Sequence, residues 1–203
     1  MKHVELLIER YPILNVVKKD VEQAIIKIVD CVKGGGKILL CGNGGSASDC
    51  EHISGEFLKG FLSKRKILDG EYPTIKGQAR EKLQKGIAAI PLTSLTALIS
   101  AFSNDVDAAY TYAQEVFALG KKGDVFIRLS TSGNAKNVIN AAEVANALDM
   151  VTICMTGEKE SPLSNASLIS IRVPETETFK VQELHLPTYH AICAQVEYEL
   201  FGK

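Results

Sequence analysis

The chain of 203 residues has no tryptophan, no Cys-x-x-Cys pair and no apolar run of membrane-spanning length. A transmembrane helix needs about 20 consecutive apolar residues, so we expect no membrane segment. Basic and acidic residues nearly balance, at 23 against 24, and no basic block occurs. This balance disfavours a nucleic-acid or membrane partner. The opening MKHVELLIER interrupts its apolar residues with charges, so we expect no signal peptide.

The cysteines also show no pattern that predicts disulfide bonds. The five cysteines are odd in number and scattered among apolar residues: Cys31, Cys41, Cys50, Cys154 and Cys193. This pattern indicates reduced, buried thiols and a cytoplasmic protein. Hydrophobic residues make up 46% of the chain and charged residues 23%, which is ordinary for a globular protein of one domain.

Residues 1–33 predict an N-terminal helical arm. Apolar residues recur at helical spacing between residues 21 and 32, and Pro12 separates a short first helix from a longer second one. Asp20 and Gln23 resemble a capping box at the start of the second helix. Such an arm packs either on its own sheet or on another copy of the chain.

The body, residues 37–203, alternates short apolar segments with helical patterns. The five predicted strands are 37–41, 86–92, 125–129, 150–154 and 168–173, and the last helix runs from about residue 178 to residue 202. This alternation predicts an α/β fold, a doubly wound parallel sheet in a three-layer αβα sandwich. The polar stretch 63–85 interrupts it as an insertion, with one helix near 78–84.

A glycine-rich turn, Gly-Asn-Gly-Gly-Ser at 42–46, follows the first predicted strand and precedes a helix. The glycines allow close approach of the backbone to a ligand, and Ser46 adds a hydroxyl donor. The start of the helix favours an anion. Because glycine turns after strands are common, this turn alone is weak evidence for a phosphate site.

A second turn strengthens that prediction. Ser130, Thr131 and Ser132 follow the third strand and precede Gly133 and Asn134. One hydroxyl is enough to cap a helix, so three in a row favour an oxyanion pocket. Both turns follow parallel strands and therefore lie at the same edge of the sheet. The chain has neither a Walker lysine nor G-x-G-x-x-G, so we expect a phosphate monoester and no nucleotide cofactor.

Candidate chemical groups follow the turns. His52 and Glu56 are four residues apart, so they share one helix face. Such a pair is more often a surface pair, but here it follows the glycine-rich turn. The C-terminal run ETFKVQELHLPTYH holds two more of the four histidines, His185 and His190.

Three stretches, GNGGSASDCEHISGE, LSTSGNAKNV and RVPETETFKVQELHLPTYHAIC, together resemble the sugar isomerase (SIS) family, most closely its phosphoheptose isomerase branch. The resemblance implies a five-stranded parallel sheet between helices. It also implies a sugar phosphate ligand, such as sedoheptulose 7-phosphate, and a homo-oligomer, dimer or tetramer, with sites at subunit interfaces.

The resemblance also implies site residues. It assigns acid–base catalysis to Glu56 and His190. It implies substrate contacts from Asn43, Gly44, Ser46, Ser130, Thr131, Ser132, Asn134 and Gln182. In some members zinc is bound at the positions of His52, Glu56, Gln182 and His190. A carboxylate and an imidazole suit the proton transfers that interconvert a ketose and an aldose through an enediol.

The chain departs from the branch at several positions. Ala135 stands where a serine is usual, Pro91 where an aspartate is usual and Lys180 where an arginine is frequent, and the insertion 63–85 is longer than usual. Pro187 lies between Gln182 and His190, which are roughly 12 Å apart along a straight helix. A shared metal site would then need a kink or ligands from two subunits. These departures leave the identity of the sugar open.

Three functions are compatible with these residues. The first is a phosphosugar isomerase. The second is a non-catalytic regulator that binds sugar phosphates, and the third is another reaction on a phosphosugar, such as lyase or etherase chemistry. The regulator of this kind in the family lacks the glutamate and the second histidine, so the presence of Glu56 and His190 favours an enzyme.

Overall fold

The computed structural model describes residues 1–202 and contains one five-stranded parallel sheet. The strands are β1 (Ile38–Gly42), β2 (Ala89–Pro91), β3 (Val125–Leu129), β4 (Val151–Thr156) and β5 (Ile169–Arg172), in the order β2-β1-β3-β4-β5. The α-helices are α1 (Lys2–Arg10), α2 (Lys18–Lys33), α3 (Gly45–Leu58), α4 (Gly77–Lys82), α5 (Thr96–Phe102), α6 (Thr111–Leu119), α7 (Lys136–Ala147), α8 (Pro162–Asn165) and α9 (Thr178–Phe201). The predicted α/β sandwich is confirmed.

The strands are apolar because both faces of the sheet are covered. All five residues of β1 and all five of β3 are buried, as expected of central parallel strands. Alternate side chains point to opposite faces, so Ile38 and Leu40 join one hydrophobic core while Leu39 and Cys41 join the other.

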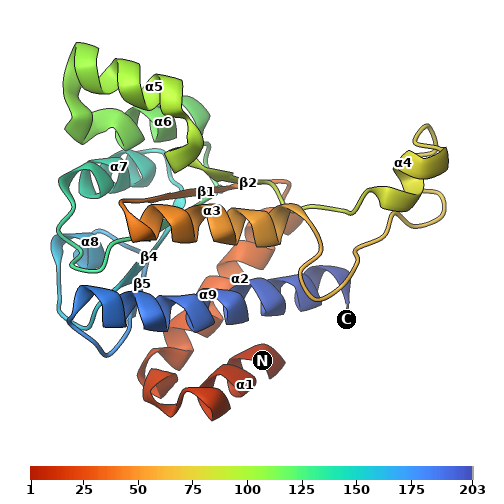
Figure 1. Ribbon diagram of the computed structural model, residues 1–203, viewed down its shortest axis with the longest axis horizontal. Helices are drawn as coiled ribbons and strands as arrows, with labels where there is room; N and C mark the ends of the chain where they lie inside the picture. The colour runs from red at the N-terminus through yellow and green to blue at the C-terminus, as the bar shows by residue number, and fades with distance from the viewer. Residues whose placement is uncertain (203) are drawn as a thin grey trace.

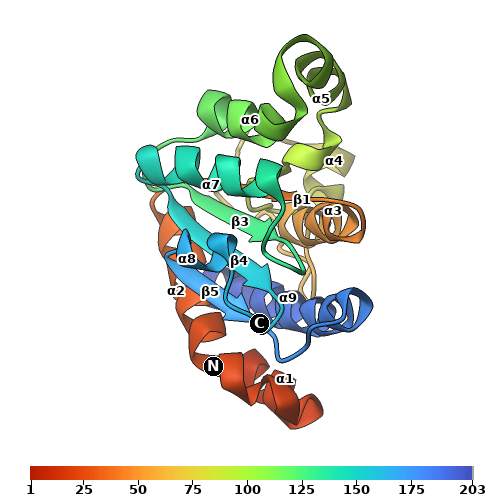
Figure 2. The ribbon, with the colours of Figure 1, turned by 90° about the vertical axis from the view of Figure 1, so that its left-hand side faces the viewer.

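Helices form the two outer layers (Figures 1 and 2). Side chains of α1, α2, α3 and α9 share the first core, and those of α6 and α7 belong to the second. Both arm helices, α1 and α2, pack against α9 of the same chain. Of the two arrangements expected for the arm, packing on its own body is therefore the one observed in this chain.

The predicted capping box at Asp20 is wrong. Helix α2 begins at Lys18, directly after a 3-10 helix at Pro12–Val17, and no side chain caps it. The preceding helical turn continues into α2, so no separate start signal is needed. Asp20 instead lies in the first turn, where a negative charge interacts favourably with the helix dipole.

The strand order determines where a ligand can bind. The chain moves from β1 outward to β2 and then crosses back to β3 on the other side of β1. The strand order therefore reverses between β1 and β3. The connection after β1 leaves toward β2 and the connection after β3 leaves toward β4, which opens a crevice at the carboxyl ends of β1 and β3. The two predicted turns follow these two strands.

The insertion projects away from the sheet and carries α4 at its far end (Figure 1). Its apolar residues Leu68, Tyr72 and Leu83 are more than half exposed.

Within residues 1–202, no helix is long and apolar enough to cross a membrane.

Candidate active site

The two turns lie side by side at the rim of the sheet and are linked through the start of α7. Gly42, the last residue of β1, pairs in register with Leu129, the last residue of β3, so both turns start at the same edge, as predicted. The amide of Asn43, in the first turn, exchanges two hydrogen bonds with that of Asn137, at 2.9 and 3.0 Å. Asn137 lies in the first turn of α7, three residues after the second turn ends.

The first turn places the start of α3 under the side chain of Gln182. Gly44 has a φ of +57°, a conformation that favours glycine. A Cβ atom on Gly45 would lie 2.5 Å from Nε2 of Gln182, so this amide rests on the helix start. Ser46 is only 3% exposed and lies beneath the rim. The exposed surface of this turn consists of Asn43, Gly44 and Gly45.

The second turn presents its hydroxyls at different depths. Ser130 is buried, Thr131 is half-buried and Ser132 is exposed. The backbone N–H of Asn134 donates to Oγ of Ser132 at 3.2 Å, and the Asn134 amide donates to the Ser132 carbonyl at 2.9 Å. These two bonds hold the turn in a fixed shape before any ligand arrives.

The hydroxyls of this turn are not a helix cap. Helix α7 begins at Lys136, its N-cap is Ala135, and no side chain caps it. Gly133 has a φ of +66°, and its ideal Cβ would lie 2.0 Å from Oγ of Ser161. The turn therefore requires glycine at this position, and its three hydroxyls are not used to start the helix.

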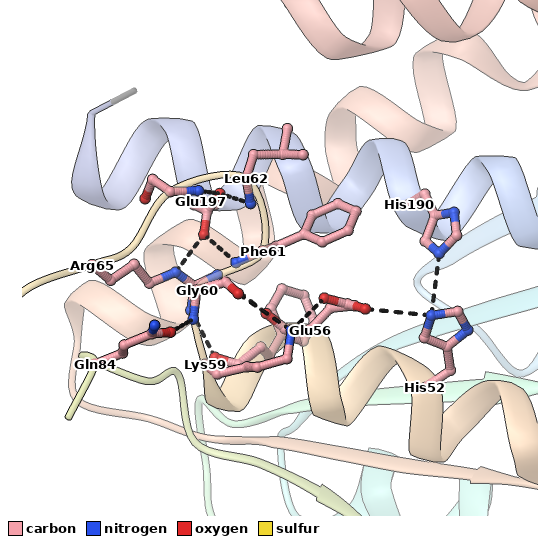
Figure 3. Close-up of polar contacts among 12 residues, drawn as sticks. His52, Glu56, Lys59, Gly60, Phe61, Leu62, Arg65, Gln84, His190 and Glu197 are labelled. Carbon is pink, nitrogen blue, oxygen red and sulfur yellow. Dashed lines mark hydrogen bonds and ion pairs between the residues drawn. The ribbon is translucent and has the colours of Figure 1, made fainter. Parts of the chain in front are cut away.

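A cluster of His52, Glu56 and His190 lies between α3 and α9 (Figure 3). Nε2 of His52 lies 3.4 Å from Oε1 of Glu56 and 3.4 Å from Nε2 of His190. The other oxygen of Glu56 accepts a bond from Nζ of Lys59 at 3.1 Å. The Glu56 side chain is 15% exposed and that of His52 is 43% exposed, so a small molecule can reach the cluster. Glu56 and His190, the expected acid–base pair, thus both approach Nε2 of His52.

The surroundings of His190 disfavour its charged form. Burial lowers the pKa of His190, and the neighbouring His52 lowers it further, while Glu56 raises it. The ring of Phe61 lies 5.7 Å from the His190 ring, centre to centre. A groove of about 400 Å³ between α1 and α9 reaches His190 and is lined by apolar residues such as Leu7 and Pro187. A neutral imidazole can accept a proton during a reaction.

The structure adds two residues that the sequence analysis missed. The hydroxyl of Tyr189 lies 3.1 Å from Oδ1 of Asp49 and 3.0 Å from Nδ1 of His52. Asp49 precedes His52 by three residues, a spacing that places both on one helix face. No spacing in the sequence could have identified Tyr189, because its contacts with Asp49 and His52 join two helices that are far apart in sequence.

His185 does not belong to the cluster. Its side chain is fully buried, and Nε2 lies 3.4 Å from the backbone oxygen of Thr156. Burial lowers the pKa of His185 to about 4, so the ring stays neutral in the core.

The donor set that the resemblance assigns to zinc is partly assembled. Two donors on one tetrahedral zinc ion, with bonds of about 2.0–2.1 Å, lie about 3.3–3.4 Å apart. The separations of His52 from Glu56 and from His190 have this value. Over residues 1–202, however, no group of three or more His, Cys, Asp or Glu side chains is placed so that it could hold a metal ion. Gln182 is turned toward Gly45. The donor chemistry suits zinc, but a complete site needs side-chain movement.

Two of the departures from the family pattern, Ala135 and Pro91, lie near these turns. Ala135 directly follows the second turn, and Pro91 ends β2 beside β1. Lys180 bonds Glu177 in the first turn of α9. Helix α9 continues as one element through Pro187, so Gln182 and His190 belong to the same helix.

Comparisons with known proteins agree with the observed fold. Residues 12–157 match the sequence model of the SIS domain. The chain is 38% identical over 183 residues to phosphoheptose isomerase 2 of Campylobacter jejuni, an alignment covering 90% of this chain and 82% of that protein. It is 36% identical over 192 residues to phosphoheptose isomerase of Methylibium petroleiphilum, covering 93% and 86%.

A solved structure shows the same architecture. Phosphoheptose isomerase from Neisseria gonorrhoeae superposes with a TM-score of 0.76 at 29% identity, covering 97% of this chain and 95% of that one. The similarity therefore includes the sheet, both turns and the C-terminal helix.

Proposed function

The chain belongs to the SIS domain family, and from this premise we propose that it is a phosphosugar isomerase that interconverts a ketose phosphate and an aldose phosphate. The substrate that we propose is sedoheptulose 7-phosphate or a ketose phosphate of similar length. The proposal depends above all on one observation: Glu56 and His190 meet at His52, on helices that begin beside the joined turns.

The reaction needs two kinds of proton transfer. A base moves a proton between C1 and C2 through an enediol, and a second group moves protons between the two oxygens. We assign the first role to the carboxylate of Glu56, whose Oε2 is held by Lys59. The second role belongs to His190, whose neutral ring can accept and return a proton.

The phosphate is held at the joined turns. Thr131 and Ser132 offer hydroxyls at the surface, and the start of α3 supplies a favourable dipole. Along the axis of α3, the Cα atoms of Ser46 and Glu56 are separated by roughly 15 Å. This separation favours a long carbon chain over a triose, since one end has to reach the turns while the other reaches Glu56.

We also propose zinc as a cofactor, held by His52, Glu56, His190 and Gln182. A zinc ion bound there would polarise the substrate carbonyl. The imidazole and carboxylate donors support this assignment, while Gln182 has to turn away from Gly45 to join them.

A homodimer or homotetramer in the cytoplasm completes the proposal. All five cysteines are free and buried, which suits a reducing compartment. Large apolar side chains are exposed along α5, α6 and the segment between them: Leu98, Val106, Tyr110 and Phe117. Burying them against a second copy would remove this surface from water.

A panel of pentose, hexose and heptose phosphates, each as ketose and aldose, tests the function. We expect turnover of a heptose phosphate, followed by NMR of the product sugar, and a raised melting temperature with every ligand that binds. The Glu56→Gln variant should keep the thermal shift and lose turnover by roughly 10²- to 10⁴-fold.

Glu143→Gln, which changes an exposed carboxylate on α7, is the matched control and should leave turnover unchanged. Full turnover by Glu56→Gln would overturn the assignment of the base. Binding without turnover across the whole panel, with a second protein co-purifying, would instead support a non-catalytic regulator.

A further inference from the structure

A buried tyrosine joins the two helices behind the candidate cluster. Tyr189 on α9 is 1% exposed, and its hydroxyl lies 3.1 Å from Oδ1 of Asp49 and 3.0 Å from Nδ1 of His52, both on α3. The hydroxyl therefore lies between a carboxylate and an imidazole on one helix. It contacts the nitrogen of His52 that faces away from Glu56.

The number of hydrogens decides which atoms donate. An ionised carboxylate only accepts, and a phenol has a single hydrogen to donate. A phenol keeps its hydrogen at neutral pH, since the ordinary pKa of tyrosine is about 10. When that hydrogen is donated to Asp49, the remaining interaction of the hydroxyl is to accept a hydrogen from Nδ1 of His52. His52 then carries its hydrogen on Nδ1.

This tautomer determines what the other nitrogen offers. With the hydrogen on Nδ1, a neutral His52 has its lone pair on Nε2, the atom 3.4 Å from both Glu56 and His190. A protonated ring would donate from Nε2 to Glu56 and still donate from Nδ1 to Tyr189. The bond to Tyr189 is therefore the same in both charge states of His52.

We propose that Tyr189 is a positioning residue: held by Asp49, it fixes the orientation and tautomer of His52 so that Nε2 faces Glu56 and His190. This role rests on the proposed function of the cluster, in which His52 serves as a metal donor beside the acid–base pair. Partners that orient a donor imidazole in this way typically change metal affinity or activity by roughly 10- to 100-fold when removed.

Tyr189→Phe tests the proposal because it removes only the hydroxyl and keeps the ring in the core. Tyr198→Phe is the matched control, since Tyr198 lies on the same helix and is 41% exposed. Nitrogen-15 NMR of the histidine rings in the full-length protein reports the tautomer directly. The His52 signals are identified by their loss in His52→Gln.

We expect the wild-type protein and Tyr198→Phe to show His52 with its hydrogen on Nδ1. Tyr189→Phe should lose this preference and bind zinc roughly 10- to 100-fold more weakly in competition with a chelator. Its kcat should fall while KM for the sugar phosphate stays close to the wild-type value. Asp49→Asn should alter the His52 signals in the same direction.

An Nε2–H tautomer in the wild-type protein would overturn the proposal, because Nδ1 of His52 would then accept the Tyr189 hydrogen in place of Asp49. Wild-type NMR signals and zinc affinity in Tyr189→Phe would also overturn it. The NMR result does not depend on turnover. A fixed Nδ1–H tautomer in a protein that isomerises no sugar phosphate would support the positioning role and count against the proposed function alone.

Discussion

Arg65 and Glu197, which are 132 residues apart in sequence, form an ion pair at 2.6 Å in which both side chains are buried. Glu197 also accepts hydrogen bonds from the backbone N–H groups of residues 61–63 (Figure 3). Arg65 donates in addition to the carbonyl oxygen of Phe57. These bonds tie the start of the insertion to α9 and to the end of α3, and so fix the loop that places Phe61 beside His190.

Glu197→Gln should strongly destabilise the fold. It leaves Arg65 as a buried charge without its counter-ion, and removing one partner of a buried pair typically costs about 3–5 kcal/mol. Urea denaturation followed by circular dichroism measures the change. Glu199→Gln, on the same helix but exposed, should cost less than about 1 kcal/mol. Equal stability of these two variants would contradict a structural role for the pair.

Glu115 should make stability depend on pH. Its side chain is 1% exposed, and within residues 1–202 neither carboxylate oxygen has a hydrogen-bond partner. Burial raises its pKa from 4.5 to about 7. The folded protein therefore binds this proton more tightly than the unfolded chain, and the free energy of unfolding falls as pH rises from about 4.5 to about 7.

Glu115→Gln removes that titration and should stabilise the protein at pH 8 by about 3 kcal/mol. The gain should shrink toward pH 5, in urea denaturation series from pH 5 to pH 8. His185 has the opposite effect on the pH dependence of the free energy of unfolding. Its pKa is about 4 in the folded protein, against an ordinary value of 6.5, so this free energy decreases as pH falls from about 6.5 to about 4. This contribution is present in both proteins and cancels in the difference. A difference that is constant with pH would disprove the assignment.

Replacing two glycines on α3 by alanine should have different effects: one substitution should lower activity and the other should raise stability. The added Cβ of Gly45→Ala would lie 2.5 Å from Nε2 of Gln182, so this flexible amide has to move. We expect near wild-type stability. We also expect a loss of about 10-fold in kcat/KM, equivalent to about 1.4 kcal/mol, because the methyl group occupies the helix start proposed for the phosphate. Gly55→Ala meets no atom within 4 Å and should stabilise the helix by about 0.5–1 kcal/mol. Full activity of Gly45→Ala would show that the phosphate does not approach the helix start at Gly45.

Sequence patterns predicted the sheet and both turns because their signals are local. The apolar strand residues and the hydroxyl run at 130–132 are continuous in sequence, and parallel strands bring their carboxyl ends to one edge. The pair His52 and Glu56 could likewise be recognised from its spacing. The family resemblance supplied His190.

Contacts between distant segments could not be predicted in this way. No periodicity links Tyr189 to Asp49 or Arg65 to Glu197, since these contacts arise only when α9 packs beside α3. The strand order, and with it the switch point between β1 and β3, also depends on long-range packing. Local patterns place residues on an edge or a face, and tertiary contacts decide which of them meet.

The paired amides of Asn43 and Asn137 hold each other in one orientation. A side-chain amide has two N–H hydrogens and two oxygen lone pairs, and the pairing uses one of each on Asn43. The second N–H hydrogen and the second lone pair of Asn43 therefore stay available to a ligand hydroxyl, in fixed directions. Ordering a side chain on binding typically costs about 0.5–1.5 kcal/mol, and this amide is ordered before any ligand arrives. An amide held in this way would favour a sugar with a hydroxyl in the matching position over its epimers.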